Sequence, residues 1–149
     1  MAITPPAIAV SELTRSFGSL RAVDGLSFEA REGEVVGFIG ANGAGKTTTM
    51  RILATLDMQD SGTAKVGGYD VSDDPSQVRK ILGWVPDAFT AYENLTVAEY
   101  VDFFARAHGF TRAERRNRVE EILEFTGLDP LADRLADKMS KGQTQRLCL

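Results

Sequence analysis

Residues 40–47 read Gly-Ala-Asn-Gly-Ala-Gly-Lys-Thr, and this stretch decides the fold class of the chain. Its spacing, G-x-x-x-x-G-K-T, is that of the phosphate-binding P-loop. The apolar run before it, at 34–39, is typical of a buried strand, and residues 47–54 after it can continue as a helix. A strand, a glycine-rich loop and a helix in this order form a phosphate cradle, which we favour over a glycine-rich turn that happens to end in Lys-Thr.

The residue types of the loop suit the chemistry of a triphosphate, which is a dense anion. A row of backbone N–H groups at a helix N-terminus supplies counter-charge. Gly40, Gly43 and Gly45 let the backbone wrap the phosphates, because glycine tolerates positive φ. Lys46 can reach the β- and γ-phosphates on its flexible stem. The Thr47 hydroxyl can ligate Mg²⁺, a hard cation that usually binds together with phosphates.

The composition is that of an ordinary globular domain, and it bears on nucleic-acid binding, disulfide formation and membrane insertion. The chain has 149 residues, of which 43% are hydrophobic and 26% charged, enough for one modest core. Its net charge of −4 gives no indication of nonspecific nucleic-acid binding. The single cysteine, Cys148, excludes an internal disulfide. We see neither a signal peptide nor an apolar run of membrane-spanning length, so we expect any membrane association to go through a partner.

Patterns of apolar and turn residues outline the other elements. Strands are expected at 8–13, 25–30, 63–66 and 81–85. A helix is expected to start at Asp74, with Pro75 in its first position. Capping boxes at 96–99 and 111–114 open two more helices. Apolar residues at helical spacing predict their core faces: Val97, Tyr100, Val101 and Phe104, then Val119, Ile122, Leu123 and Phe125.

A second motif stands at residues 139–147, Met-Ser-Lys-Gly-Gln-Thr-Gln-Arg-Leu. Ser140 and Gln143 form a capping box, and a helix N-terminus with a serine hydroxyl is a second anion site. The stretch resembles the LSGGQ-x-Q-R-L signature of the ATP-binding cassette (ABC) family, with Met139 and Lys141 as departures. Alone it could be an ordinary helix start, but its interval after a P-loop favours the resemblance.

Other landmarks of that family resemblance follow in order. Residues 22–28 resemble the strand ahead of the P-loop, and 94–97 resemble the start of the helical subdomain. Phe17 stands where the family places an aromatic that stacks on adenine; a core aromatic is an equally weighted alternative. Residues 82–87 resemble the strand that leads to the Q-loop, but Asp87 replaces the usual Gln. Its carboxylate could still approach Mg²⁺.

The resemblance implies an α/β fold: a P-loop NTPase core with an incomplete parallel sheet, a β-rich N-terminal segment and a helical subdomain. We expect one nucleotide-binding domain over 1–149, with the core and β segment at about 1–90 and the helical subdomain at about 91–140. The implied cofactors are ATP and Mg²⁺. The implied nucleotide-binding residues are Phe17, Gly40, Asn42, Gly43, Gly45, Lys46, Thr47 and Thr48. The implied metal ligands are Thr47 and Asp87, and the residues acting in trans are Ser140, Gly142 and Gln143.

The implied function is that of the ATP-binding subunit of an ABC transporter, peripheral on the cytoplasmic face of the cell membrane. Its partners would be a membrane permease and a second nucleotide-binding domain in a head-to-tail dimer, with no nucleic acid. The alternatives are a non-transport ABC ATPase and a truncated product without activity. The family's Asp-Glu and later His lie beyond Leu149, so we expect no ATP turnover by this chain alone. The only histidine, His108, is expected to end a helix.

Overall fold

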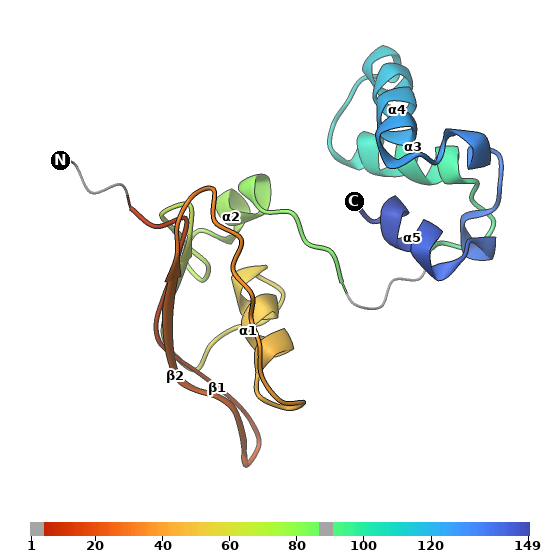
Figure 1. The fold of residues 1–149 in the computed structure, drawn as a ribbon. Coiled ribbons are helices and arrows are strands. Elements are labelled where there is room, and N and C mark those ends of the chain that lie inside the picture. The colour runs from red at the N-terminus through yellow and green to blue at the C-terminus, as the bar shows by residue number, and fades with distance from the viewer. Residues whose placement is uncertain (1–4, 87–90) are drawn as a thin grey trace. The chain divides into compact units, whose positions relative to one another are not determined.

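The computed structural model describes residues 5–86 and 91–149, which fall into two units, Met1–Trp84 and Val85–Leu149 (Figure 1). The first unit is a small antiparallel sheet covered by helices, and the second is helical. The chain is therefore of mixed α/β structure, as predicted, but the predicted incomplete parallel sheet is not found: every strand pair of the described residues is antiparallel. Asp87 lies outside the described residues.

The sheet of the first unit has the strand order β2-β1-β3-β4, and every described pair is antiparallel. A hairpin joins β1 to β2, with Phe17 opposite Leu20 beside the turn and Ile8 opposite Ala30 at the far end. The strands expected at 8–13, 25–30 and 63–66 lie within these elements. The four strands are β1 (Ile8–Phe17), β2 (Leu20–Ala30), β3 (Ser61–Val66) and β4 (Tyr69–Asp70).

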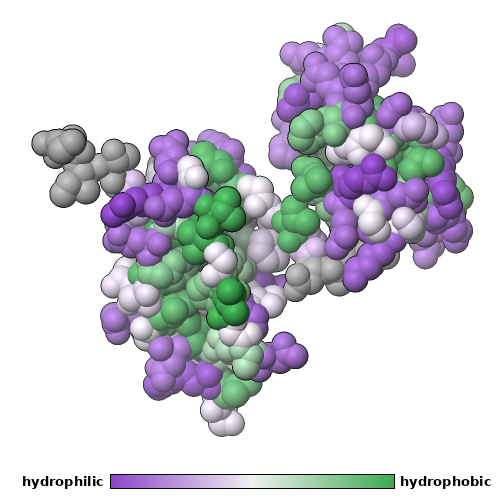
Figure 2. Space-filling view, in the orientation of Figure 1, coloured by the Kyte–Doolittle hydropathy of each residue, from purple (hydrophilic) through white to green (hydrophobic). Residues whose placement is uncertain are grey.

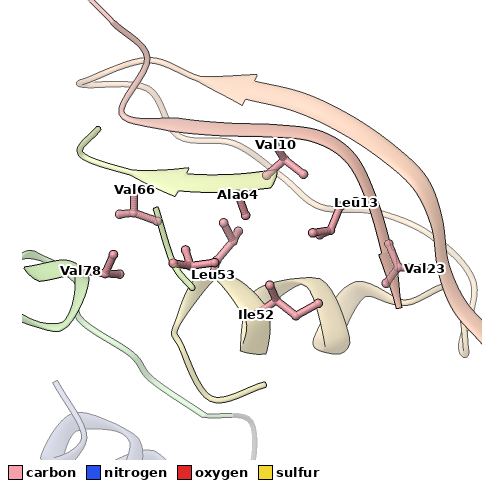
Figure 3. Packing of buried hydrophobic residues seen from close by; sticks show 9 residues of the cluster. Val10, Leu13, Val23, Ile52, Leu53, Ala64, Val66 and Val78 are labelled. Atoms are coloured by element: carbon pink, nitrogen blue, oxygen red, sulfur yellow. The ribbon is translucent and has the colours of Figure 1, made fainter. Parts of the chain in front are cut away.

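Two helices pack on this sheet and bury its apolar side chains. Helix α1 (Lys46–Leu53) contacts β2 and β3, and α2 (Pro75–Ile81) contacts β4 and has Asp74 at its N-cap position, as expected. Figure 3 shows how the side chains of α1 lie against those of the strands. Leu13 and Ile52 are completely buried there. The buried cluster consists of Val10, Leu13, Val23, Ile52, Leu53, Ala64, Val66, Val71 and Val78.

Two of the predicted strands are wrong. Residues 34–39 leave the sheet without a regular partner, and the side chains of Val35 and Ile39 are almost fully exposed. In the second case, Ile81 ends α2 and residues 82–86 form no strand. A buried parallel strand needs neighbours from distant parts of the chain, and the described residues offer these two segments none. Apolar side chains consequently gather on the surface of this unit, shown in green in Figure 2.

The described part of the second unit contains three α-helices, and each begins with a capping box formed by its own residues. In each capping box, the N-cap hydroxyl accepts a hydrogen bond from the backbone N–H of the N3 residue, whose side chain bonds back to the N-cap N–H. The boxes predicted at Thr96, Thr111 and Ser140 are all confirmed, and His108 caps the C-terminus of the first helix, as expected. The helices are α3 (Val97–Ala107), α4 (Arg112–Thr126) and α5 (Lys141–Leu147), with short 3₁₀ turns at Asp129–Leu131 and Ala136–Lys138.

Ion pairing and helix capping hold these helices together around a second core. Arg115 of α4 pairs with Asp102 of α3 at 2.8 Å. Arg146 of α5 donates to the Thr126 carbonyl at 3.0 Å, which places a cation at the C-terminal end of α4. The core residues are Ala91, Val97, Tyr100, Val101, Leu123, Leu128, Ala136 and Leu147.

The predicted core faces are correct except at two aromatic positions. Phe104 is partly exposed and Phe125 is 85% exposed. The buried face of α4 centres on Leu123 and Thr126, and Phe125 lies beyond its edge. None of the described helices combines the length and the apolar character needed to cross a membrane.

Candidate functional site

The loop at 40–45 is seated against the β1–β2 hairpin through Gly45. This residue is the N-cap of α1 and has φ 78°, in the left-handed region that favours glycine. A Cβ at Gly45 would collide with the carbonyl oxygen of Ala22 and lie 3.0 Å from the Val23 side chain. Gly43 also has positive φ, 83°, but a Cβ there would meet nothing. The loop is therefore in close contact with β2 at Gly45 and faces open space at Gly43.

The start of α1 leaves backbone donors for a ligand. Thr49 is the first residue whose N–H bonds back within the helix, to the Gly45 carbonyl at 2.8 Å. The N-cap residue Gly45 has no side chain with which to cap the helix, and the described first turn of α1 holds no acidic residue. The N–H groups of Lys46, Thr47 and Thr48 are thus the unpaired donors that a helix N-terminus presents, at its positive end.

Lys46 turns back over the loop. Its Nζ donates to the carbonyl oxygens of Gly40 at 2.7 Å and Ala41 at 2.6 Å. The ammonium group therefore lies among the same loop residues that would surround a phosphate. Asn42 is exposed at the turn of this loop. The structure thus brings the predicted P-loop residues from Gly40 to Thr48 together in one cradle.

Of the two predicted Mg²⁺ ligands, the structure describes Thr47, which is exposed in the first turn of α1. The other predicted ligand, Asp87, is outside the described residues. The described residues contain no group of three or more His, Cys, Asp or Glu side chains placed to hold a metal ion. One hydroxyl suits Mg²⁺ because this ion keeps several waters and takes further oxygens from substrate phosphates.

Phe17 lies at the end of β1, next to the hairpin turn. It is 46% exposed and belongs to neither of the buried clusters in the described parts of the chain. The guanidinium of Arg15 lies over its ring, 4.7 Å from the centroid. Between the two alternatives for Phe17, this placement disfavours the core aromatic. Sequence reasoning overlooked Arg15; its position two residues before Phe17 on the same strand is the signal that could have found it.

The second motif forms the start of α5 in the second unit. The Ser140 hydroxyl accepts from the Gln143 N–H at 3.4 Å, and the Gln143 side-chain oxygen accepts from the Ser140 N–H at 2.9 Å. A Cβ at Gly142 would meet no atom within 4 Å. The three predicted residues therefore share one helical turn with open space at its glycine.

Comparison with known proteins places these features in a family. A family model described as "ABC transporter" matches residues 23–149. The chain is 40% identical over 141 residues to the daunorubicin/doxorubicin resistance ATP-binding protein DrrA of Streptomyces peucetius, covering 95% of this chain and 43% of that protein. It is 35% identical over 148 residues to the Fe(3+) ions import ATP-binding protein FbpC of Brucella suis, covering 99% of this chain and 42% of that protein.

The fold agrees with a solved structure. A structure described as the ATP binding subunit of an ABC transporter superposes with a TM-score of 0.80 at 28% identity, covering 95% of this chain and 59% of that one. The chain thus spans less than half the length of the two relatives named above.

Proposed function

This chain belongs to the ABC transporter family, and from that premise we propose that it is the nucleotide-binding part of an ATP-binding subunit that powers transport across a membrane. Family membership rests on the match over residues 23–149. The observation that carries the proposed activity is the seating of the loop: Gly45 fixes it on β2, and three N–H groups of α1 remain for phosphate. We place the whole of 1–149 in one nucleotide-binding domain, with a helical subdomain from about residue 91.

Each loop residue has a defined task in this proposal. The backbone N–H groups of 46–48 would bind phosphate oxygens, as helix N-termini do. Lys46 would exchange its bonds to the Gly40 and Ala41 carbonyls for bonds to phosphate. Thr47 would give its hydroxyl to Mg²⁺, which supplies charge neutralisation of the phosphates when bound. Phe17 would stack on the base.

Nucleotide binding is tested by the stability of the full chain in Mg·ATP. A ligand that binds only the folded state at 100-fold excess over Kd stabilises it by about 2.7 kcal/mol. We expect that gain with Mg·ATP, and we expect Lys46→Ala to abolish most of it. Lys65→Ala is the matched control, because Lys65 is an exposed lysine on β3. A folded sample that shows neither binding heat nor stabilisation with Mg·ATP would reject the proposal.

The second motif is proposed to act in trans, at the nucleotide held by a second copy of the domain. The open space at Gly142 makes this testable without damage to the fold. Gly142→Ala should stabilise α5 slightly, since alanine is a better helix former by about 1 kcal/mol. The same methyl group should hinder a partner that approaches this turn. We expect this variant to lose ATP-dependent dimerisation in sedimentation measurements; unchanged dimerisation would contradict the role in trans.

The remaining proposals concern the partner of the subunit and its location in the cell. We propose a membrane permease as the partner and a peripheral position at the cytoplasmic face. The relatives' names include both a resistance protein and an import protein, so the direction of transport is left out of the proposal. Co-purification of the subunit with a membrane protein encoded beside it tests this assignment.

A further inference from the structure

Arg15 is held in place by two carboxylates. Its Nη2 lies 2.8 Å from Asp57 Oδ1, and its Nη1 lies 3.0 Å from Asp60 Oδ1. The side chains of Arg15 and Asp57 are largely buried, with 23% and 16% exposed. Paired with two carboxylates, the guanidinium has little rotational freedom, and its Cζ lies over the Phe17 ring, 4.7 Å from the centroid.

One of the two carboxylates, Asp60, is itself anchored to the backbone of β1. Asp60 Oδ2 accepts from the Ser16 N–H at 2.7 Å, and the Asp60 N–H donates to the Thr14 carbonyl at 2.9 Å. The hydrogen bond from the Ser16 N–H and the neighbouring Arg15 guanidinium lower the pKa of Asp60, so its carboxylate stays charged to a lower pH than an ordinary aspartate. The three side chains form a clamp, which we call the Arg15 clamp (Arg15, Asp57 and Asp60).

Phe17, the ring over which Arg15 lies, is an exposed aromatic residue of the β1–β2 hairpin. Phe17 pairs with Leu20 beside the hairpin turn, and Ala22, two residues further along β2, is the residue against which Gly45 is seated. The same hairpin therefore carries both the ring and the support of the loop. An aromatic ring has two faces, so a guanidinium over one face leaves the other available for stacking with a planar base.

We propose that Arg15 is a positioning residue for the nucleotide base: held by Asp57 and Asp60, it covers one face of Phe17 and leaves the opposite face to a planar purine. This rests on the proposed function, since it takes ATP as the ligand. The role is distinct from phosphate binding, because Arg15 contacts the ring of Phe17 and no residue of the loop is among its described partners.

The experiment compares two probes on the full chain by calorimetry, Mg·ATP and magnesium tripolyphosphate, which lacks the base. Arg15→Ala should weaken Mg·ATP binding roughly two- to fivefold, the range of an exposed cation–π contact, and leave tripolyphosphate binding unchanged. In the Phe17→Ala background, Arg15→Ala should have no further effect on Mg·ATP. The exposed Arg116 provides the control variant, Arg116→Ala, which removes the same charge in the second unit.

The outcomes separate the inference from the function on which it rests. Equal weakening of both probes by Arg15→Ala would show a purely structural role, and tighter Mg·ATP binding would show that Arg15 occupies the base's own face; either result overturns the inference. If Arg15→Ala does not fold, Arg15→Gln keeps the carbon chain to Cδ and a polar end without the guanidinium, and must show the same selective loss. If the unaltered chain binds neither probe, the proposed function is overturned and the inference falls with it.

Discussion

The two units differ in how their backbone and apolar groups find partners. In the second unit, each helix start is closed by residues three positions apart, as with Thr96 and Glu99. In the first unit, residues 34–39 carry an equally clear apolar pattern but lie without a partner strand. A cap completes itself locally, whereas a strand depends on a neighbour that its own sequence does not specify. The predictions below test this contrast, beginning with the largest expected effect.

The sharpest contrast lies between two apolar residues of the first unit. Leu13 is completely buried, so Leu13→Ala should lower the free energy of unfolding by about 2–5 kcal/mol through lost contacts and a cavity. Val35 is fully exposed, and Val35→Ala should change it by less than about 0.5 kcal/mol. Urea unfolding followed by circular dichroism measures both. Equal losses would mean that 34–39 is a buried strand after all.

The two positive-φ glycines of the loop should differ as well. Gly43→Ala meets open space and should cost about 1–2 kcal/mol for the left-handed backbone alone. Gly45→Ala has the same strain and must also displace the Ala22 carbonyl, so its cost should reach about 3 kcal/mol. Thermal unfolding of the two variants without ligand compares them directly. A cost at Gly45 no larger than at Gly43 would show that the loop is not seated on β2.

The caps of the second unit should each contribute a smaller amount. Thr96→Ala removes the acceptor for the Glu99 N–H and should destabilise the unit by about 1 kcal/mol. Thr96→Ser keeps the hydroxyl and serves as the matched control. The same pair of changes at Thr111 should give a similar result. If alanine and serine behave alike in urea unfolding, the caps do not contribute as the geometry indicates.

The smallest effect is a pH dependence of these caps. Hydrogen bonds from the backbone and side chain of Thr96 lower the pKa of Glu99, and those from the side chain and backbone of Thr111 lower that of Glu114. Because the folded pKa values are depressed, the stabilisation is complete above the ordinary value of 4.5 and is lost as pH falls through the lowered values. Unfolding measured across this acid range should show a weaker pH dependence for Glu99→Gln. An unchanged dependence would contradict the assignment.

How far the sequence predicts the fold follows from the same distinction. The capping boxes, the helix end at His108 and the strands of the antiparallel sheet follow from residues close in sequence or from simple alternation. Residues 34–39 were wrongly predicted as a strand because an apolar run indicates burial without naming the partner. Phe125 was wrongly placed in the core because helical spacing alone leaves the edge of a buried face undefined.

The candidate site shows the same limit. The loop from Gly40 to Thr47 is a contiguous motif, so its spacing was sufficient to predict a cradle. The Arg15 clamp was overlooked because Arg15 is more than 40 residues away from Asp57 and Asp60 in the sequence and meets them only when β3 pairs with β1. Nothing in the sequence indicates that these charged residues form ion pairs in the fold. The roles of all these residues toward nucleotide stay predictions.

The seating of Gly45 on Ala22 also bears on the order in which the protein is made. The hairpin that supports the loop at 40–45 precedes it in the chain, and the core beneath α1 is completed by β3 and α2, all before residue 82. A growing chain emerges from the ribosome N-terminal end first and folds in that order. Every element that seats the loop therefore leaves the exit tunnel before the second motif does, so the loop can acquire its shape during translation.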